Sequence, residues 1–245
     1  MSLIVGTAGW SIPANDAGSF IKKGSLLERY ASRFPGVEVN SSFYRSHRIS
    51  TWARWSDSVP ENFRFSVKIP KAITHERKLI ECDDLMAKFL GEVSALGHKL
   101  AVLLIQLPPR LSFQASLVSD FFKMLSSRTA VRLACEPRHL SWFGEDADRL
   151  LKSFKIARVA ADPALTPEAG RPAGWQGLSY WRLHGSPVMY RSAYGTERLS
   201  EYSQLVREER KAGHSVWCIF DNTASFAATS DALAILARAN PKIAN

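Results

Sequence analysis

Residues 100–107 read LAVLLIQL, and this stretch gives the strongest indication of the fold class. Amphipathic helical patterns lie on both sides of it, over residues 84–96 and 114–126. A short apolar run between two helices is typical of a parallel strand that helices cover. The sequence around residues 100–107 therefore predicts a unit in which strand and helix alternate.

The same alternation continues along the whole chain. The expected strands cover residues 3–9, 36–43, 64–70, 100–107, 130–137, 156–162, 178–184 and 215–221. The expected helices cover residues 25–34, where Ser25 is the expected N-cap, and 49–57, 84–96, 114–126, 146–154, 200–212 and 226–239. Residues 163–177 are rich in Pro and Gly, so we expect a loop with little helix there.

Eight units within 245 residues leave about 30 residues for each, which is close to the minimum size of a βα unit. The sequence GTAGWS (6–11) after the first strand does not match the G-x-G-x-x-G fingerprint of a dinucleotide-binding sheet. No low-complexity linker divides the chain. We therefore predict an α/β fold, a single TIM-type (β/α)8 barrel that residues 1–245 form as one domain.

The composition is that of an ordinary globular protein, with 46% hydrophobic and 22% charged residues. The chain has three cysteines without C-x-x-C spacing, which excludes a disulfide framework and a zinc ribbon. Cys135 and Cys218 lie in apolar runs, which is typical of core thiols in a reducing compartment. The longest unbroken apolar run, from Leu100 to Ile105, is too short to cross a membrane. The N-terminus has no signal-peptide pattern, so we expect a cytoplasmic protein without a membrane partner.

The net charge points to an anionic partner. The chain carries 32 Lys and Arg against 23 Asp and Glu, which gives +9. The charge is spread over both halves of the chain, but basic residues dominate between Arg64 and Lys78. This segment follows the third strand, on the face where a barrel keeps its site, so we interpret it as part of an anion-binding mouth.

Polar side chains mark the carboxyl ends of the expected strands, on the side that faces the barrel lumen. These residues are Glu38, Asn40, Lys68, Gln106, Glu136, Arg138, Arg158, Asp162, Arg182 and His184. Burial of such groups is costly unless they pair with one another or meet a ligand. Two interpretations stay open, a functional site and an internal salt-bridge layer that fills the mouth of the barrel.

The loops after the strands add further candidates. Lys71, Thr74 and His75 follow the third strand, and the aromatic residues Trp10, Tyr44 and Tyr194 suit stacking on sugar or base rings. Glu38, Glu136 and His184 can supply general acid–base catalysis. Potential metal ligands also lie near the strand ends, but Lys68, Arg138 and Arg182 can neutralise the carboxylates, so no metal site is assigned. These potential ligands are Glu38, His75, Glu136, His139, Asp162, His184 and Asp221. No nucleophile-elbow or Walker motif is present.

Seven short motifs resemble the domain-of-unknown-function 72 family, also called YecE-like. They are GTAGWS (6–11), LLERYASRF and VEVNSSFYR (26–45), FRFSVKIPKAITHERKL (63–79), LIQLPP (104–109), EPRHLSW (136–142), RLHG (182–185) and FDNT (220–223). The resemblance implies a TIM-type barrel, distantly similar to sugar isomerase and endonuclease IV barrels, without an established activity. It also adds His139 and Asn222 to the polar motif positions. Ile12, Pro137 and Asp221 depart from the family pattern, which leaves substrate specificity open.

The sequence thus predicts an enzyme that acts on an anionic substrate, phosphorylated or derived from nucleic acid. The expected catalytic residues are Glu38, Glu136 and His184. The expected substrate-binding residues are Trp10, Asn40, Tyr44, Lys68, Lys71, Thr74, His75, Gln106, Arg138, Arg182, Tyr194 and Asn222. Two alternatives stay open, a protein that binds duplex nucleic acid or resembles the nuclease endonuclease IV, and a barrel that binds a metabolite without turnover. No cofactor and no oligomeric state are assigned.

Overall fold

Each of the eight expected strands is present in the computed structural model, which describes residues 2–239. They are β1 (Leu3–Thr7), β2 (Gly36–Val39), β3 (Arg64–Lys68), β4 (Leu100–Gln106), β5 (Arg132–Glu136), β6 (Ile156–Arg158) with β7 (Ala160–Asp162), β9 (Leu178–Leu183) and β10 (Ser215–Phe220). The expected strand 156–162 is thus divided at Val159. The loop that follows holds a short strand, β8 (Ala173–Gly174), and a 3₁₀ turn over Pro167–Gly170.

Helices follow the strands as the sequence predicted. They are α1 (Leu26–Ala31), α3 (Ile49–Asp57), α4 (Asp83–Val93), α5 (Ala115–Arg128), α6 (Glu145–Ser153), α7 (Thr196–Lys211) and α8 (Ala227–Ala239). Short helical segments add to them: α2 (Ser41–Tyr44) directly after β2, a π-helical turn over Ala72–Glu76, and 3₁₀ segments over Ala14–Ser19, Ser94–Lys99 and Leu140–Phe143. Ser25 is the N-cap of α1, where its hydroxyl accepts from the Glu28 amide and the Glu28 carboxylate accepts from the Ser25 amide.

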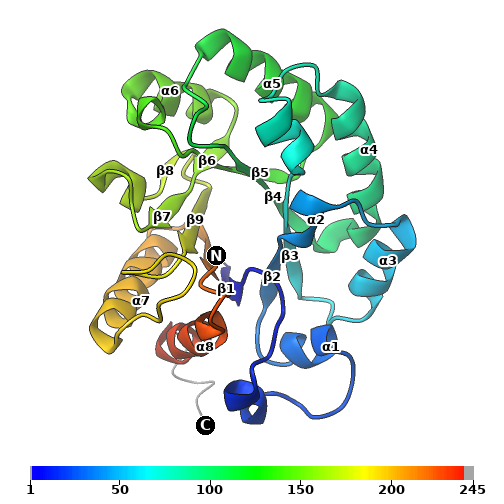
Figure 1. Cartoon of the computed structure of the whole chain (residues 1–245), viewed down its shortest axis with the longest axis vertical. Coiled ribbons are helices and arrows are strands. Elements are labelled where there is room, and N and C mark those ends of the chain that lie inside the picture. The colour runs from blue at the N-terminus through cyan, green and yellow to red at the C-terminus, as the bar shows by residue number, and fades with distance from the viewer. Residues whose placement is uncertain (1, 240–245) are drawn as a thin grey trace.

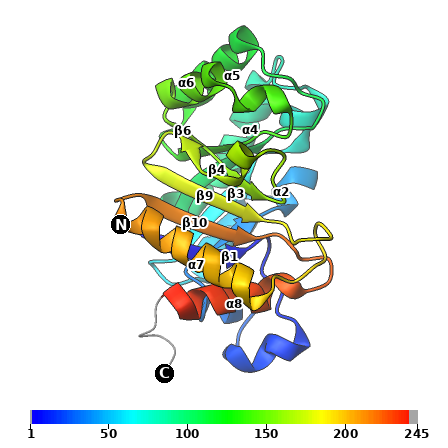
Figure 2. The ribbon, with the colours of Figure 1, turned by 90° about the vertical axis from the view of Figure 1, so that its left-hand side faces the viewer.

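Within residues 2–239 the strands form two sheets. One has the order β1-β10-β9-β7 and is parallel, and the other has the order β2-β3-β4-β5-β6-β8 and is parallel except for β8. The long helices surround the strands (Figure 1), and α7 and α8 lie over β9, β10 and β1 (Figure 2). The architecture is therefore a mixed α/β fold with parallel sheets, and no hydrogen-bonded sheet closes on itself among the described strands.

The two sheets approach each other closely where β1 meets β2. The Gly9 amide donates to the Glu38 carbonyl over 2.8 Å, and Ala8 forms an isolated parallel bridge with Glu38. A Cβ atom on Gly6 would collide with the Gly36 carbonyl oxygen, and a Cβ on Gly36 would lie 2.7 Å from the Arg64 carbonyl. Glycine is therefore required at this junction because the backbones leave no room for a side chain.

The apolar side chains divide between the two faces of the strands. Val5, Val37 and Phe65 belong to the large cluster between strands and helices. A second buried cluster on the opposite face includes Val102 and Leu104, and Tyr180 stacks on Trp217 within it at 5.8 Å. This division confirms the alternation expected for most strands. The thiols of Cys82, Cys135 and Cys218 are buried and free.

The expected orientation of strand 156–162 is wrong. Ala157 and Val159 belong to the inner cluster, whereas Arg158 lies over the Phe143 ring and donates to the Glu168 carbonyl. Asp162 likewise pairs away from the inner face, with Arg198. The physical reason is that loop 163–177 contributes backbone partners outside this strand, so polar side chains are satisfied on its outer face.

The helices give no sign of a membrane span. In the part of the chain from residue 2 to residue 239, none of them is both long and apolar enough to cross a bilayer.

Candidate active site

The guanidinium of Arg182 on β9 lies at the centre of a buried group of charges. It binds Glu38 with two bonds, Nε to Oε2 at 3.0 Å and Nη2 to Oε1 at 2.7 Å. Its Nη1 donates to Glu136 Oε2 at 2.6 Å, and Nη2 also donates to Asp221 Oδ2 at 2.8 Å. One cation therefore joins carboxylates from β2, β5 and the end of β10, which the parallel arrangement brings to the same end of the strands.

His184 follows β9 and lies between two of these carboxylates. Its Nδ1 is 3.1 Å from Asp221 Oδ2, and its Nε2 is 3.0 Å from both Glu136 Oε1 and Arg138 Nη2. A neutral ring can donate to Asp221 and accept from Arg138, and a protonated ring can donate to both carboxylates. The ring is thus held between two carboxylates and an arginine. We call Glu38, Glu136, Arg138, Arg182, His184 and Asp221 the charged cluster.

Glu38 is the most enclosed carboxylate of the charged cluster. Besides its two bonds to Arg182, its Oε2 accepts from the Tyr180 hydroxyl at 2.8 Å, and that hydroxyl is 2.8 Å from Ser66 Oγ. Burial and the Glu38 charge raise the pKa of Tyr180 well above its usual value. Tyr180 therefore keeps its proton and donates it to Glu38 while it accepts from Ser66.

The electrostatics of the cluster favour ionised carboxylates. Burial alone would raise the pKa of Glu136, but Arg182, Arg138 and His184 outweigh it and hold that pKa well below the usual range. Asp221 behaves in the same way, since Arg182 and His184 lower its pKa against the effect of burial. At neutral pH both groups therefore carry charge and accept hydrogen bonds.

Three polar groups beside these paired charges have no partner within residues 2–239. Arg138 Nε and Asn40 Oδ1 are buried without a hydrogen bond, although Asn40 Nδ2 donates to Asp221 Oδ1 at 3.4 Å. The Lys68 ammonium makes no hydrogen bond or ion pair and lies 3.9 Å from the Phe43 ring centre. Burial and the nearby Arg182 lower the pKa of Lys68 to about 8. These are the groups free to meet a ligand.

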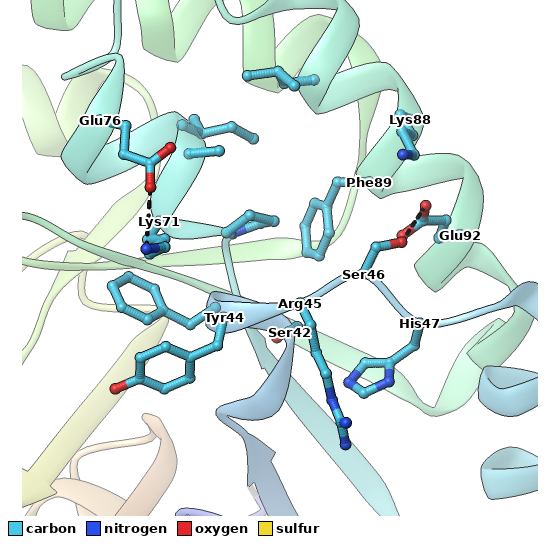
Figure 3. Close-up of a pocket in the computed structure, with 15 residues that line it drawn as sticks. Ser42, Tyr44, Arg45, Ser46, His47, Lys71, Glu76, Lys88, Phe89 and Glu92 are labelled. Atoms are coloured by element: carbon cyan, nitrogen blue, oxygen red, sulfur yellow. Dashed lines mark hydrogen bonds and ion pairs between the residues drawn. The ribbon is translucent and has the colours of Figure 1, made fainter.

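Two cavities lie on either side of residues 40–47, the segment that follows β2. One has a volume of about 300 Å³, and Tyr44, Lys71 and Phe89 line it (Figure 3). The other has a volume of about 370 Å³, and Trp10, Asn40 and Trp55 line it. Arg45 and His47 line both. Asn40 connects the second cavity to the charged cluster, because its amide donates to Asp221.

Most of the other predicted site residues lie at this end of the strands. Gln106 Nε2 donates to Glu136 Oε2 at 3.0 Å. The His75 ring packs on Phe43 at 4.9 Å and bonds the Thr74 hydroxyl over 2.8 Å. Burial and the Lys68 charge lower the pKa of His75, which favours the neutral ring. Lys71 is exposed and pairs with Glu76 at 3.1 Å (Figure 3).

Tyr194 and Asn222 are placed differently from the other predicted residues. The Tyr194 hydroxyl donates to Asp162 Oδ2 at 2.7 Å and accepts from the Gly185 amide. The Asn222 amide donates to Asp231 and to the Ser192 carbonyl. Both side chains therefore hold loop 185–194, and neither contacts the charged cluster.

Sequence reasoning did not assign Arg45, His47 or Trp55 to the site. His47 packs against the rings of Trp52 and Trp55 and bonds Ser41 Oγ at 2.8 Å. Arg45 belongs to the motif SSFYR, which is recognisable in the sequence, but the turn α2 was not predicted. This turn places Arg45 between the two cavities.

The acidic and histidine side chains of residues 2–239 include no set of three or more that could hold a metal ion. The Arg182 guanidinium occupies the position between Glu38, Glu136 and Asp221 where a cation would meet these carboxylates. This arrangement assigns the neutralising charge to the protein itself.

Comparison with known proteins identifies a family model that matches nearly the whole chain and relatives that match parts of it. The model of the protein family of unknown function DUF72 matches residues 4–245. UPF0759 protein YecE of Escherichia coli (strain K12) is 33% identical over 107 residues, which cover 43% of this chain and only 38% of that relative. UPF0759 protein YunF of Bacillus subtilis (strain 168) is 24% identical over 253 residues, which cover 90% of this chain and 88% of that protein.

Solved structures share the fold. A DUF72 family protein of Enterococcus faecalis V583 superposes with a TM-score of 0.83 at 22% identity, over 97% of this chain and 95% of the other. A DUF72 family protein of Thermotoga maritima MSB8 gives a TM-score of 0.79 at 21% identity and covers 100% of both chains.

Proposed function

This chain belongs to the DUF72 family of unknown function, and we propose that it is an enzyme that acts on an anionic substrate, phosphorylated or derived from nucleic acid. One observation carries the proposal: within residues 2–239 the buried carboxylates are paired, whereas Lys68, Arg138 Nε and Asn40 Oδ1 lack partners. A layer of salt bridges with a purely structural role would satisfy its buried donors. Lys68 and Arg138 Nε are unpaired cationic donors and support a ligand with negative charge, while Asn40 Oδ1 is an acceptor that a ligand donor could meet.

We also infer that the two sheets together make a TIM-type (β/α)8 arrangement, and that residues 1–245 act as one domain. The bond from Gly9 to the Glu38 carbonyl supports this arrangement at one junction, and the continuous chain through Val159 supports it at the other. Barrels of this type carry their active sites at the carboxyl ends of the strands. The charged cluster has that position.

Glu136 and His184 are the proposed acid–base pair, because their 3.0 Å contact allows a proton to pass between them. Lys68, Lys71 and Arg138 would bind the anionic group, while Trp10 and Tyr44 would flank a ring of the substrate. Glu38 was expected to be catalytic, but both its oxygens are engaged by Arg182 and Tyr180. We therefore assign Glu38 the positioning of Arg182.

The test is thermal stabilisation by a panel of phosphorylated sugars and nucleotides, followed by mass-spectrometric detection of products. We expect at least one compound to raise the melting temperature of the wild type in proportion to its occupancy. The variant Arg138→Gln should lose this shift, whereas Arg149→Gln, on an exposed helix, should keep it. No shift with any compound would refute the proposal, and a shift without products would indicate a metabolite-binding protein.

Binding of nucleic acid is the second candidate function, because aromatic side chains project from the loops at this end. Tyr44 is 72% exposed, Phe226 62% and Tyr190 40%. Exposed rings beside Lys and Arg suit stacked bases and phosphates. Filter binding of duplex and single-stranded DNA across a salt series tests this function, since affinity should fall steeply with salt. No binding at low salt would remove it.

A cytoplasmic location is part of the proposal. It is supported by Cys82, Cys135 and Cys218, which are free thiols. Free thiols are typical of proteins in reducing compartments.

A further inference from the structure

We propose that Lys68 is a nucleophilic amine that forms an imine with a small aldehyde or ketone carrying a carboxylate or phosphate group. This inference rests on the proposed function, because the acidic group of the substrate would occupy Lys71 and Arg138, while Lys68 acts as the nucleophile instead of binding the anion. The inference adds a substrate class and a covalent step to the proposed function.

Lys68 is unlike the other lysines with which it can be compared. Lys99 is equally buried, at 6% exposed, but its ammonium donates to the carbonyls of Ser56 and Val59 at 2.7 and 2.9 Å. Lys71 is exposed and pairs with Glu76. Lys68 is 6% exposed, and its ammonium has neither a carbonyl nor a carboxylate partner within residues 2–239. Two hydrogen bonds to carbonyl groups explain why Lys99 is buried, whereas no such bond explains the burial of Lys68.

The surroundings of Lys68 increase the neutral fraction of its amine. Its charge is disfavoured by burial and by the nearby Arg182, against the opposing effect of Glu38, Glu136 and Asp221, so its pKa is lowered to about 8. A lysine in water has a pKa of about 10.4 and is almost wholly protonated at neutral pH. Burial of this kind is the usual way in which proteins activate a lysine for attack on a carbonyl carbon.

The position of Lys68 also suits the reaction. It is the last residue of β3, at the end of the strands where Glu136 and His184 lie. The His75 ring contacts the same Phe43 ring as the Lys68 ammonium does, and its lowered pKa leaves it able to accept a proton. A nucleophile and a proton acceptor thus lie against the same aromatic ring, and the charge of Arg138 acts on His75.

The covalent step balances without a further reactant. The Lys68 nitrogen lone pair forms a bond to the carbonyl carbon as the C–O π bond breaks, and one amine hydrogen moves to the oxygen. The remaining C–O bond then breaks, the oxygen leaves as water with the second amine hydrogen, and one added proton makes the imine cationic. The iminium can accept the electron pair of a neighbouring C–H or C–C bond as that bond breaks. Hydrolysis returns Lys68 and releases the product.

The experiment is reductive trapping in the intact protein with two probes, glyoxylate and acetaldehyde. Cyanoborohydride supplies hydride to any imine, and peptide mapping by mass spectrometry measures modification at each lysine. At about pH 7 we expect Lys68 to react with glyoxylate about tenfold or more faster than exposed Lys152, because a larger fraction of its amine is neutral. Lys99 should react slowly, since its ammonium is engaged by carbonyl groups.

Two variants serve as controls. Lys68→Arg keeps the positive charge and cannot form an imine, so rapid labelling should disappear while the melting temperature stays near that of the wild type. Lys152→Arg removes an exposed lysine on α6 and should leave labelling of Lys68 unchanged.

The possible outcomes separate the two proposals. Labelling of Lys68 that favours glyoxylate over acetaldehyde, relative to Lys152, supports both the amine and the anion-binding groups. Rapid labelling without preference for glyoxylate supports the amine and contradicts the anionic substrate. Labelling of Lys68 no faster than that of Lys152 overturns the inference, and the thermal-shift test then decides the proposed function alone.

Discussion

Replacement of Arg182 by methionine tests whether the charged cluster depends on its central cation. Methionine nearly preserves the length of the side chain but removes every bond to Glu38, Glu136 and Asp221. Glu136 would keep Arg138 and His184, and Asp221 would keep His184. Glu38 would keep the Tyr180 hydroxyl but lose its ion pair.

The expected loss of stability is about 3–5 kcal/mol, the usual cost of removing one partner from a buried ion pair. The loss should also depend on pH. In the wild type the pKa values of Glu136 and Asp221 are lower in the folded protein than in the unfolded chain. These two carboxylates therefore stabilise the fold at a pH above their unfolded pKa, and this stabilisation disappears as the pH falls through their folded pKa. Arg182 is the largest of the charges that oppose burial, so without it we expect burial to outweigh the remaining Arg138 and His184 and to raise the folded pKa values of Glu136 and Asp221 above their unfolded values. Their contribution then decreases as pH rises, so the loss should be larger at about pH 8 than at about pH 5.

Urea denaturation followed by circular dichroism at these two pH values measures both quantities. Arg149→Met is the matched control, since Arg149 pairs with Asp146 at the surface and should cost at most about 1 kcal/mol. A loss for Arg182→Met as small as that of the control, or the same loss at both pH values, would refute the electrostatic argument.

Two further predictions concern the fold around the site. Gly6→Ala should destabilise the protein by about 1–3 kcal/mol or more, because the new methyl group meets the Gly36 carbonyl. The control Gly91→Ala on α4 has open space around the new methyl group and should stabilise the protein by about 0.5–1 kcal/mol. Equal urea unfolding midpoints for the two variants would contradict the close approach of β1 and β2. Asn222→Ala should accelerate amide hydrogen exchange in loop 185–194, because the Ser192 carbonyl and Asp231 lose their common donor. The amides of β4 should keep their protection. Unchanged exchange in the loop would contradict the anchoring role of Asn222.

The sequence predicted the strands and the residues of the charged cluster well, because both follow from local patterns. Alternation of apolar and polar side chains placed Glu38, Glu136 and Arg182 on one face, and parallel strands bring that face together. The capping box at Ser25 is a local signal as well. Such features depend on the nearest few residues, which the sequence shows directly.

Other features depend on contacts between distant segments. Arg158 was assigned to the wrong face because its partner, the Glu168 carbonyl, belongs to a loop whose path is set by tertiary packing. The sequence could not show that Asn222 is engaged by Asp231, or that Lys68 is left unpaired while Lys99 is not. The division of the strands into two sheets likewise depends on how β1 meets β2, which no local pattern encodes.

The shared guanidinium of Arg182 has a consequence for how this protein can change over generations. Positions 38, 136 and 221 belong to distant parts of the chain, yet each depends on the same side chain. The effect of a substitution at one position therefore depends on the residues at the others, and single effects do not add. Loss of the arginine becomes tolerable only after its carboxylates have been replaced, so the order of substitutions is constrained.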